Sequence, residues 1–320
     1  MLHSSASPDD WSKGVWVAPL VLGTLYAVGY LLFTKGTGSK NDNSAWQAVG
    51  CFGMFASKVL FTKLIPESYS LSVSSGLDPS SSGLLVSVYS GAHTIGYVAM
   101  WKMLRSQGRK QSLPPELRRS AYAAAVVLLT SGTAGFAVAA EFANLLPGEL
   151  SAAAAMLACR AIGGVGGGII VYTALNVGAT TGPPEQWPVN MLQLMVASAV
   201  GSGSGPLLAS VSRFIREVSS AGSFQFYDDI LLCLVLGMAV RSLGESPEGK
   251  AAASEAACET AGSSPPAKCA AAAPIGCGLV LCVARAFVLS NSEVVTSMIL
   301  ETGAGWARVD IGLAVGAVFL

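Results

Sequence analysis

Long apolar runs separated by short polar connections dominate this sequence. A membrane-spanning helix needs about 20 mostly apolar residues, and the chain offers such a run repeatedly. We therefore expect spans at Val15–Phe33, Ala45–Ile65, Gly83–Leu104, Ala121–Ala140, Leu150–Leu175, Pro188–Ser210, Phe226–Leu243 and Pro274–Ser290, and a ninth that begins near Val309.

One connection is long. Residues 244–273 are rich in Ala, Ser and Glu and contain Pro265 and Pro266, a composition typical of a flexible linker. The pattern predicts an all-α fold, a polytopic transmembrane helical bundle, in four parts. These are a tail with one additional span (1–44), a block of six helices (45–243), the linker (244–273) and the beginning of a second block (274–320).

Composition supports the membrane class. Hydrophobic residues make up 52% of the chain and charged residues 12%, whereas soluble domains carry about twice that charged fraction. The net charge is zero, so nothing indicates a nucleic-acid partner. The sequence contains no G-x-x-x-x-G-K-S/T loop and no H-E-x-x-H pair. We expect an integral multi-pass membrane protein that is no enzyme and holds no cofactor or metal.

Basic residues set the expected orientation. If the loop Arg105–Arg119 is cytoplasmic, eleven lysines and arginines lie on that side and four on the other, which satisfies the positive-inside rule. The eleven are Lys35, Lys40, Lys102, Arg105, Arg109, Lys110, Arg118, Arg119, Arg241, Lys250 and Lys268, and the four are Lys13, Arg213, Arg216 and Arg308.

Arg160 is the first candidate functional residue. It lies within an apolar span and is followed by the glycine-rich run that ends at Gly168. A charge in hydrocarbon is costly and usually faces a cavity, so Arg160 is a candidate for substrate contact or proton coupling. The alternative is a structural arginine that ties helices together through carbonyls or a carboxylate. The glycines after it, Gly164 and Gly166 among them, allow a neighbouring helix to approach closely.

Other charged residues also lie within or beside the spans. Lys63 and Glu67 are spaced i,i+4 and can pair on one helix face. Either they form an interfacial pair with snorkelling lysine stems, or Lys58 or Lys63 lines the cavity and attracts an anionic substrate. His93, in the middle of a span, could relay protons or donate to a carbonyl.

Two further groups carry charge near span ends. Arg285 and Glu293 lie eight residues apart and share a helix face, so either can line the cavity opposite Arg160. The alternative is that Arg285 pairs with a neighbour near mid-depth and Glu293 lies at the outer end of the helix. Asp228 and Asp229 open the sixth span of the block, where acidic residues suit the dipole of a helix N-terminus. The alternative is an ion site.

Four motifs in order resemble the major facilitator superfamily. The turn Gly76–Gly83 with Leu84–Tyr89 is similar to the family's first-to-second helix junction, and Leu104–Lys110 resembles the end of its cytoplasmic loop motif. Arg160–Gly168 matches the fourth-helix motif, and Gly201–Ser210 resembles the fifth-helix Gly-Pro motif. The segment Gly76–Tyr89 also shares four identities with Gly305–Val318, as a parallel repeat of two blocks would.

The chain departs from the family in two respects. Trp101 and Arg105 stand where the loop motif has a glycine and an aspartate, which puts family-typical gating in doubt. The second block stops within its second helix, so the resemblance implies a chain truncated in its second six-helix half.

The resemblance implies secondary active or facilitative transport of a small solute or ion, with protons as a coupling ion, by alternating access. It assigns transport or coupling to Arg160, and the cavity-facing alternatives of the other charged residues add candidates. The whole expected set comprises coupling residues (Arg160, Lys58, Lys63, Glu67, His93, Arg285, Glu293), packing or hinge residues (Gly164, Gly166, Gly201, Gly205, Pro206) and a cytoplasmic gate loop (Arg105, Gly108, Arg109, Lys110). The alternative is a non-transporting remnant or helper that associates with a partner chain supplying the missing helices.

Overall fold

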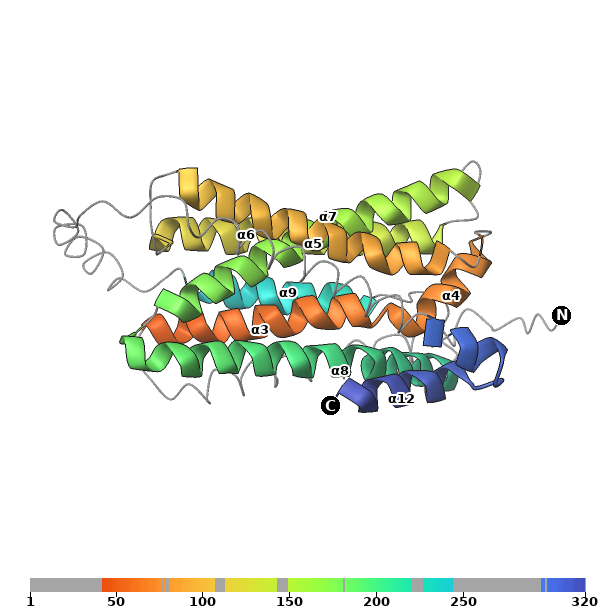
Figure 1. Cartoon of the computed structure of the whole chain (residues 1–320). Coiled ribbons are helices and arrows are strands. Elements are labelled where there is room, and N and C mark those ends of the chain that lie inside the picture. The colour runs from red at the N-terminus through yellow and green to blue at the C-terminus, as the bar shows by residue number, and fades with distance from the viewer. Residues whose placement is uncertain are drawn as a thin grey trace, which may run out of the picture.

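The computed structural model describes residues 42–75, 78, 81–106, 113–142, 149–180, 182–219, 227–243, 295–296 and 298–319. Helices account for the regular structure of these residues and no strand occurs among them, which confirms the all-α class. In the numbering of Figure 1 the elements are α3 (Asp42–Thr62), α4 (Ile65–Ser74), α5 (Ser81–Ser106), α6 (Pro115–Glu141), α7 (Glu149–Thr180), the short 3-10 helix η3 (Pro184–Gln186), α8 (Trp187–Ser219), α9 (Tyr227–Ser242) and α12 (Arg308–Phe319).

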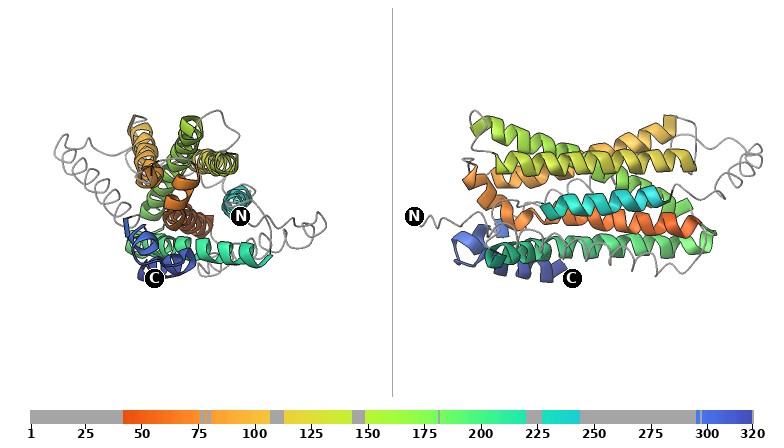
Figure 2. Two further views of the ribbon diagram at one scale, coloured as in Figure 1. Left: turned by 90° about the vertical axis from the view of Figure 1, so that its right-hand side faces the viewer. Right: turned by 180° about the vertical axis from the view of Figure 1, so that it is seen from behind.

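The long helices lie side by side and run in alternating directions (Figure 1). Helix α7 packs against α5, α6 and α3, while α8 lies along α3 and also contacts α12. The end view in Figure 2 shows α3 near the centre of the bundle and α12 outside, against α8.

Glycines explain the close packing of α7. A Cβ on Gly164 would lie 2.5 Å from the carbonyl oxygen of Tyr89 on α5, and one on Gly166 would lie 2.7 Å from the carbonyl oxygen of Ala125 on α6. The two glycines therefore face different neighbours, and the lack of side chains lets α5 and α6 approach one helix from two sides.

Three segments of the described chain are long and apolar enough to cross a membrane: Glu116–Glu141, Ala152–Thr180 and Pro184–Phe214. A fourth is available if Ala45–Thr62 and Ile65–Ser74, bent by 41° at their junction, count as one broken span. These findings support a membrane protein, and the full nine-span topology stays a prediction.

The remaining predicted spans differ in outcome. Helices occur where Gly83–Leu104 and Phe226–Leu243 are expected, but α9 has only 16 residues and α5 carries serines, glycines and basic residues among its apolar ones. Neither is among the candidate spans. The predicted spans Val15–Phe33 and Pro274–Ser290 and the linker 244–273 lie outside the described residues.

Candidate functional site

A buried ion cluster joins α9 to the junction of α3 and α4. The ammonium nitrogen of Lys63 lies 2.5 Å from Asp228 Oδ2 and 2.8 Å from Asp229 Oδ1. All three residues are buried, and the Ser212 hydroxyl of α8 donates to Asp228 Oδ2 at 2.8 Å. Both aspartates lie in the first turn of α9, so its N-terminal dipole adds to the stabilisation of their charge.

The expected pairing of Lys63 with Glu67 stays a prediction. The i,i+4 spacing brings two side chains onto one face only within a continuous helix, and the helix is interrupted at Lys63 and Leu64. The structure adds two partners for the ammonium group, carboxylates that lie about 165 positions further along the chain. Glu67 is buried on α4.

Arg160, on α7, is 8% exposed and enters the same region. Its NH1 group donates to the Leu60 carbonyl at 3.2 Å. Leu60 is one of the last four residues of α3, whose carbonyls lack donors within the helix, so Arg160 supplies the missing donor. The guanidinium carbon lies 4.6 Å from the ring centre of Tyr89 and 5.5 Å from that of Phe136. The carbonyl contact is of the kind described by the structural alternative for Arg160, and its coupling role stays a prediction.

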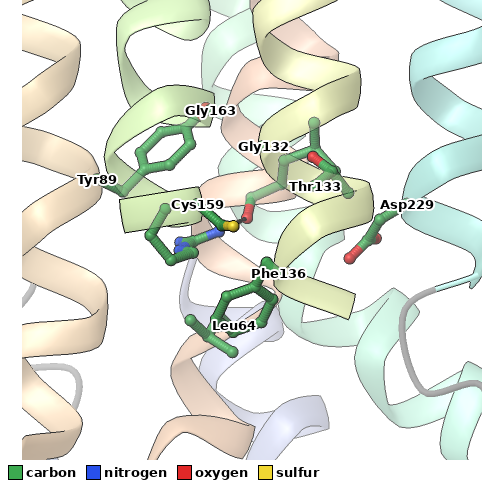
Figure 3. A pocket seen from close by; sticks show the side chains of 10 residues that line it. Leu64, Tyr89, Gly132, Thr133, Phe136, Cys159, Gly163 and Asp229 are labelled. Carbon is green, nitrogen blue, oxygen red and sulfur yellow. Dashed lines mark hydrogen bonds between the residues drawn. The ribbon is translucent and has the colours of Figure 1, made fainter. Parts of the chain in front are cut away.

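Arg160 and Asp229 both line a small cavity, which Figure 3 shows from close by. Its volume, counted as space open to the centre of a water molecule, is about 10 Å³, which suits roughly one water. Tyr89 of α5 and Asp229 of α9 lie on opposite sides of it, with Thr133 and Phe136 of α6 between them. Its lining residues are Leu60, Leu64, Tyr89, Gly132, Thr133, Phe136, Cys159, Arg160, Gly163 and Asp229.

The four charges around this cavity balance one another. Lys63 and Arg160 are cationic, while Asp228 and Asp229 are anionic, so the set is neutral when all four are ionised. An uncompensated buried charge is expensive, and the balance explains how so many charges fit within one apolar bundle. We call Lys63, Arg160, Asp228 and Asp229 the ion cluster.

The other expected coupling residues lie away from the cavity lining. Lys58 is half-buried on α3, with its ammonium group 5.9 Å from the ring centre of Phe61. His93 lies on α5 with its ring centre 6.4 Å from that of Tyr89, and its buried Nε2 has no hydrogen-bond partner within the described structure. Arg285 and Glu293 lie outside the described residues.

The Gly-Pro segment of α8 faces α3. A Cβ on Gly201 would lie 2.5 Å from the Phe55 carbonyl oxygen, and one on Gly205 would lie 2.8 Å from the backbone nitrogen of Lys63. Pro206 lies inside α8. This segment therefore packs directly against the end of α3 that carries the ion cluster.

One residue of the predicted gate loop is described. Arg105 is exposed at the end of α5, and its guanidinium carbon lies 5.3 Å from the Trp101 ring centre. Gly108, Arg109 and Lys110 lie outside the described residues.

Sequence reasoning did not bring Lys63, Asp228 and Asp229 together, although a signal existed. The predicted orientation puts the end of the second span and the beginning of the seventh on the same side of the membrane, where opposite charges can meet. Within the described residues, no three His, Cys, Asp or Glu side chains gather as a metal site would require. No protein-family model matches the chain, and no curated protein matches it.

Proposed function

We propose that this chain belongs to a membrane transport system in which a small solute binds inside the helical bundle and is exposed alternately to the two sides. One observation carries the proposal: a neutral cluster of four buried charges lies at a broken helix and borders a cavity. Ionisable residues inside membrane proteins usually serve substrate or ion pathways. Discontinuous helices recur at the binding sites of secondary transporters.

The break between α3 and α4 supports this proposal because it places polar main-chain groups inside the helical bundle. The last carbonyls of a helix lack intrahelical donors, and Arg160 supplies a donor to Leu60 at this point. Irregular backbone is tolerated at membrane depth where it is buried in protein or lines a water-filled cavity, and Leu60 and Leu64 both line the cavity. The site thus combines charge, a free volume and a bend in one place.

An uptake assay tests the proposal. The full chain is reconstituted in liposomes and offered radiolabelled formate, phosphate, an amino acid and glucose. We expect saturable uptake of one class, and its loss in Arg160→Ala. Arg118→Ala is the matched control, because Arg118 also stacks on an aromatic ring, with its guanidinium carbon 5.6 Å from the Trp46 ring centre, but does not line the cavity.

Two results separate the alternatives. Normal uptake by Arg160→Ala at normal expression would remove the assigned role of Arg160. Absence of uptake for every solute class, together with co-purification of a second membrane protein, would support the non-transporting helper in place of the transporter.

A further inference from the structure

One edge of the Arg160 guanidinium group makes no hydrogen bond within the described structure. Tyr89 and Phe136 lie against the guanidinium group, and its NH1 group is bonded to the Leu60 carbonyl. Its Nε and its other terminal nitrogen, NH2, are buried and have no hydrogen-bond partner within the described structure. Because buried polar groups are almost always hydrogen-bonded, a residue that is 8% exposed and has two vacant donors at a cavity points to a ligand.

The geometry of the unused edge selects the ligand class. Nε and one terminal nitrogen of a guanidinium group present two parallel N–H donors, which match the two oxygens of a carboxylate. The cavity has room for roughly one water. Even the smallest carboxylate therefore requires the cavity walls to move apart, which favours a small monocarboxylate over a larger oxyanion. Thr133, whose side chain borders the cavity from α6, adds a hydroxyl group.

Charge balance then requires a proton. The ion cluster is neutral before a ligand enters, so a bound carboxylate would leave one uncompensated negative charge in the bundle. Asp229 lines the cavity, whereas Asp228 is held by both Lys63 and Ser212. Protonation of Asp229 restores neutrality and leaves Lys63 its second carboxylate partner.

The surroundings of Asp229 contain few other groups that could take this proton. No titratable residue of α6 lines the cavity, because α6 contributes only Gly132, Thr133 and Phe136. Among the described residues, the charged or titratable groups around Asp229 are Lys63 from the α3–α4 junction, Tyr89 from α5, Cys159 and Arg160 from α7, and Asp228 and Cys233 from α9.

We infer that this cavity is a joint binding site for a small monocarboxylate and a proton, with the carboxylate on the free edge of Arg160 and the proton on Asp229. The inference gives the substrate class of the proposed transporter and rests on that function for its role in transport. Binding itself is measurable without transport.

Formate is the probe, because it is the smallest monocarboxylate, and formamide is its neutral control of nearly the same shape. The purified full chain in nanodiscs is titrated with each at constant ionic strength, and the ligand-dependent rise of the unfolding temperature reports binding. We expect formate to stabilise the chain more than formamide does. In the range where Asp229 is ionised without ligand, the apparent formate affinity should fall about tenfold for each unit of rising pH, since one proton binds with each formate.

Variants assign the two parts of the site. Asp229→Asn should bind formate without this pH dependence, because its side chain is neutral at every pH. Arg160→Lys keeps the charge but loses the fork, and should weaken formate binding by at least about tenfold, as expected for the loss of one charge-assisted hydrogen bond. Arg118→Lys is the matched control and should leave binding unchanged.

Three results would overturn the inference. They are equal stabilisation by formate and formamide, unchanged formate affinity in Arg160→Lys, and an unchanged pH dependence in Asp229→Asn. The first of these would mean that the site does not select a carboxylate. Formate binding as described, without uptake of any solute in liposomes, would refute the transport proposal and support the joint binding site. Uptake of another solute without preferential formate binding would support the transport proposal and refute the joint binding site.

Discussion

Replacing Lys63 by methionine should destabilise the fold strongly. Methionine has nearly the same length, so the change removes the charge while the volume is largely kept. The ammonium group lies within 2.8 Å of both Asp228 and Asp229, which are buried. Its loss leaves two adjacent carboxylates with no cation in bonding contact. Removal of one partner of a buried ion pair typically costs about 3–5 kcal/mol, and we expect a loss in that range.

The same reasoning predicts a rescue. Replacement of a whole buried ion pair by uncharged groups of similar volume is often neutral or stabilising. Lys63→Met combined with Asp228→Asn leaves Arg160 and Asp229 with opposite charges, so the combined variant should recover most of the loss. The single variant should also lose more stability as pH rises, because its excess carboxylate can be neutral only when it binds a proton. In the combined variant this pH dependence should be weaker.

Unfolding of the purified chain in mixed detergent micelles measures these differences. Lys102→Met is the matched control, because Lys102 is exposed on α5 and exposed charges contribute about 0–1 kcal/mol. A Lys63→Met variant within about 1 kcal/mol of the control would show that the ion cluster is not held as described. A combined variant as unstable as Lys63→Met would show that lost packing, and not charge, caused the effect.

Three further predictions concern packing, topology and the aromatic support of Arg160. Gly96→Ala should cost about 1–3 kcal/mol in unfolding experiments because its Cβ would overlap the α7 main chain, whereas Gly91→Ala, with open space around it, should stabilise by about 0.5–1 kcal/mol. Equal effects of the two would contradict the close contact of α5 with α7. In a cysteine-free background, Phe142→Cys and Glu185→Cys should react with an impermeant maleimide from opposite sides, because α7 lies between them and is long and apolar enough to cross a membrane; labelling from one side would refute that crossing. Tyr89→Phe should cost about 0.5–1.5 kcal/mol, since it loses hydrogen bonds of 3.3 Å to α3 but keeps its ring beside Arg160, and a larger loss would show that the hydroxyl does more than join two helices.

The helices were predictable because hydropathy marks them directly. The expected runs Ala121–Ala140 and Leu150–Leu175 lie within α6 and α7. The observed helices extend further because main-chain hydrogen bonding continues into polar turns that hydropathy does not count. Helix α6 begins at Pro115, and proline suits the first helical position, where the missing N–H is not needed.

The site was harder to predict because its contacts are distant in the chain. Lys63 and Asp229 are 166 positions apart, so no local spacing relates them, and the i,i+4 pattern with Glu67 suggested a nearer partner. That pattern assumed a continuous helix through Lys63. Pro66, whose ring cannot fit inside a regular helix, follows the break and lies in the first turn of α4, and it was the local signal for an interruption.

The break between α3 and α4 connects the ion cluster to any motion of the bundle. Two contacts hold the junction: Arg160 donates to the Leu60 carbonyl on one side, and Lys63 bonds to α9 on the other. A proton on Asp229 would weaken one of the bonds of Lys63, and a carboxylate on Arg160 would draw the guanidinium group toward the cavity. Both events act on the same junction. A ligand can shift a conformational equilibrium only through contacts that differ between the two states, so the contacts at this junction are where a shift on joint binding of ligand and proton is expected.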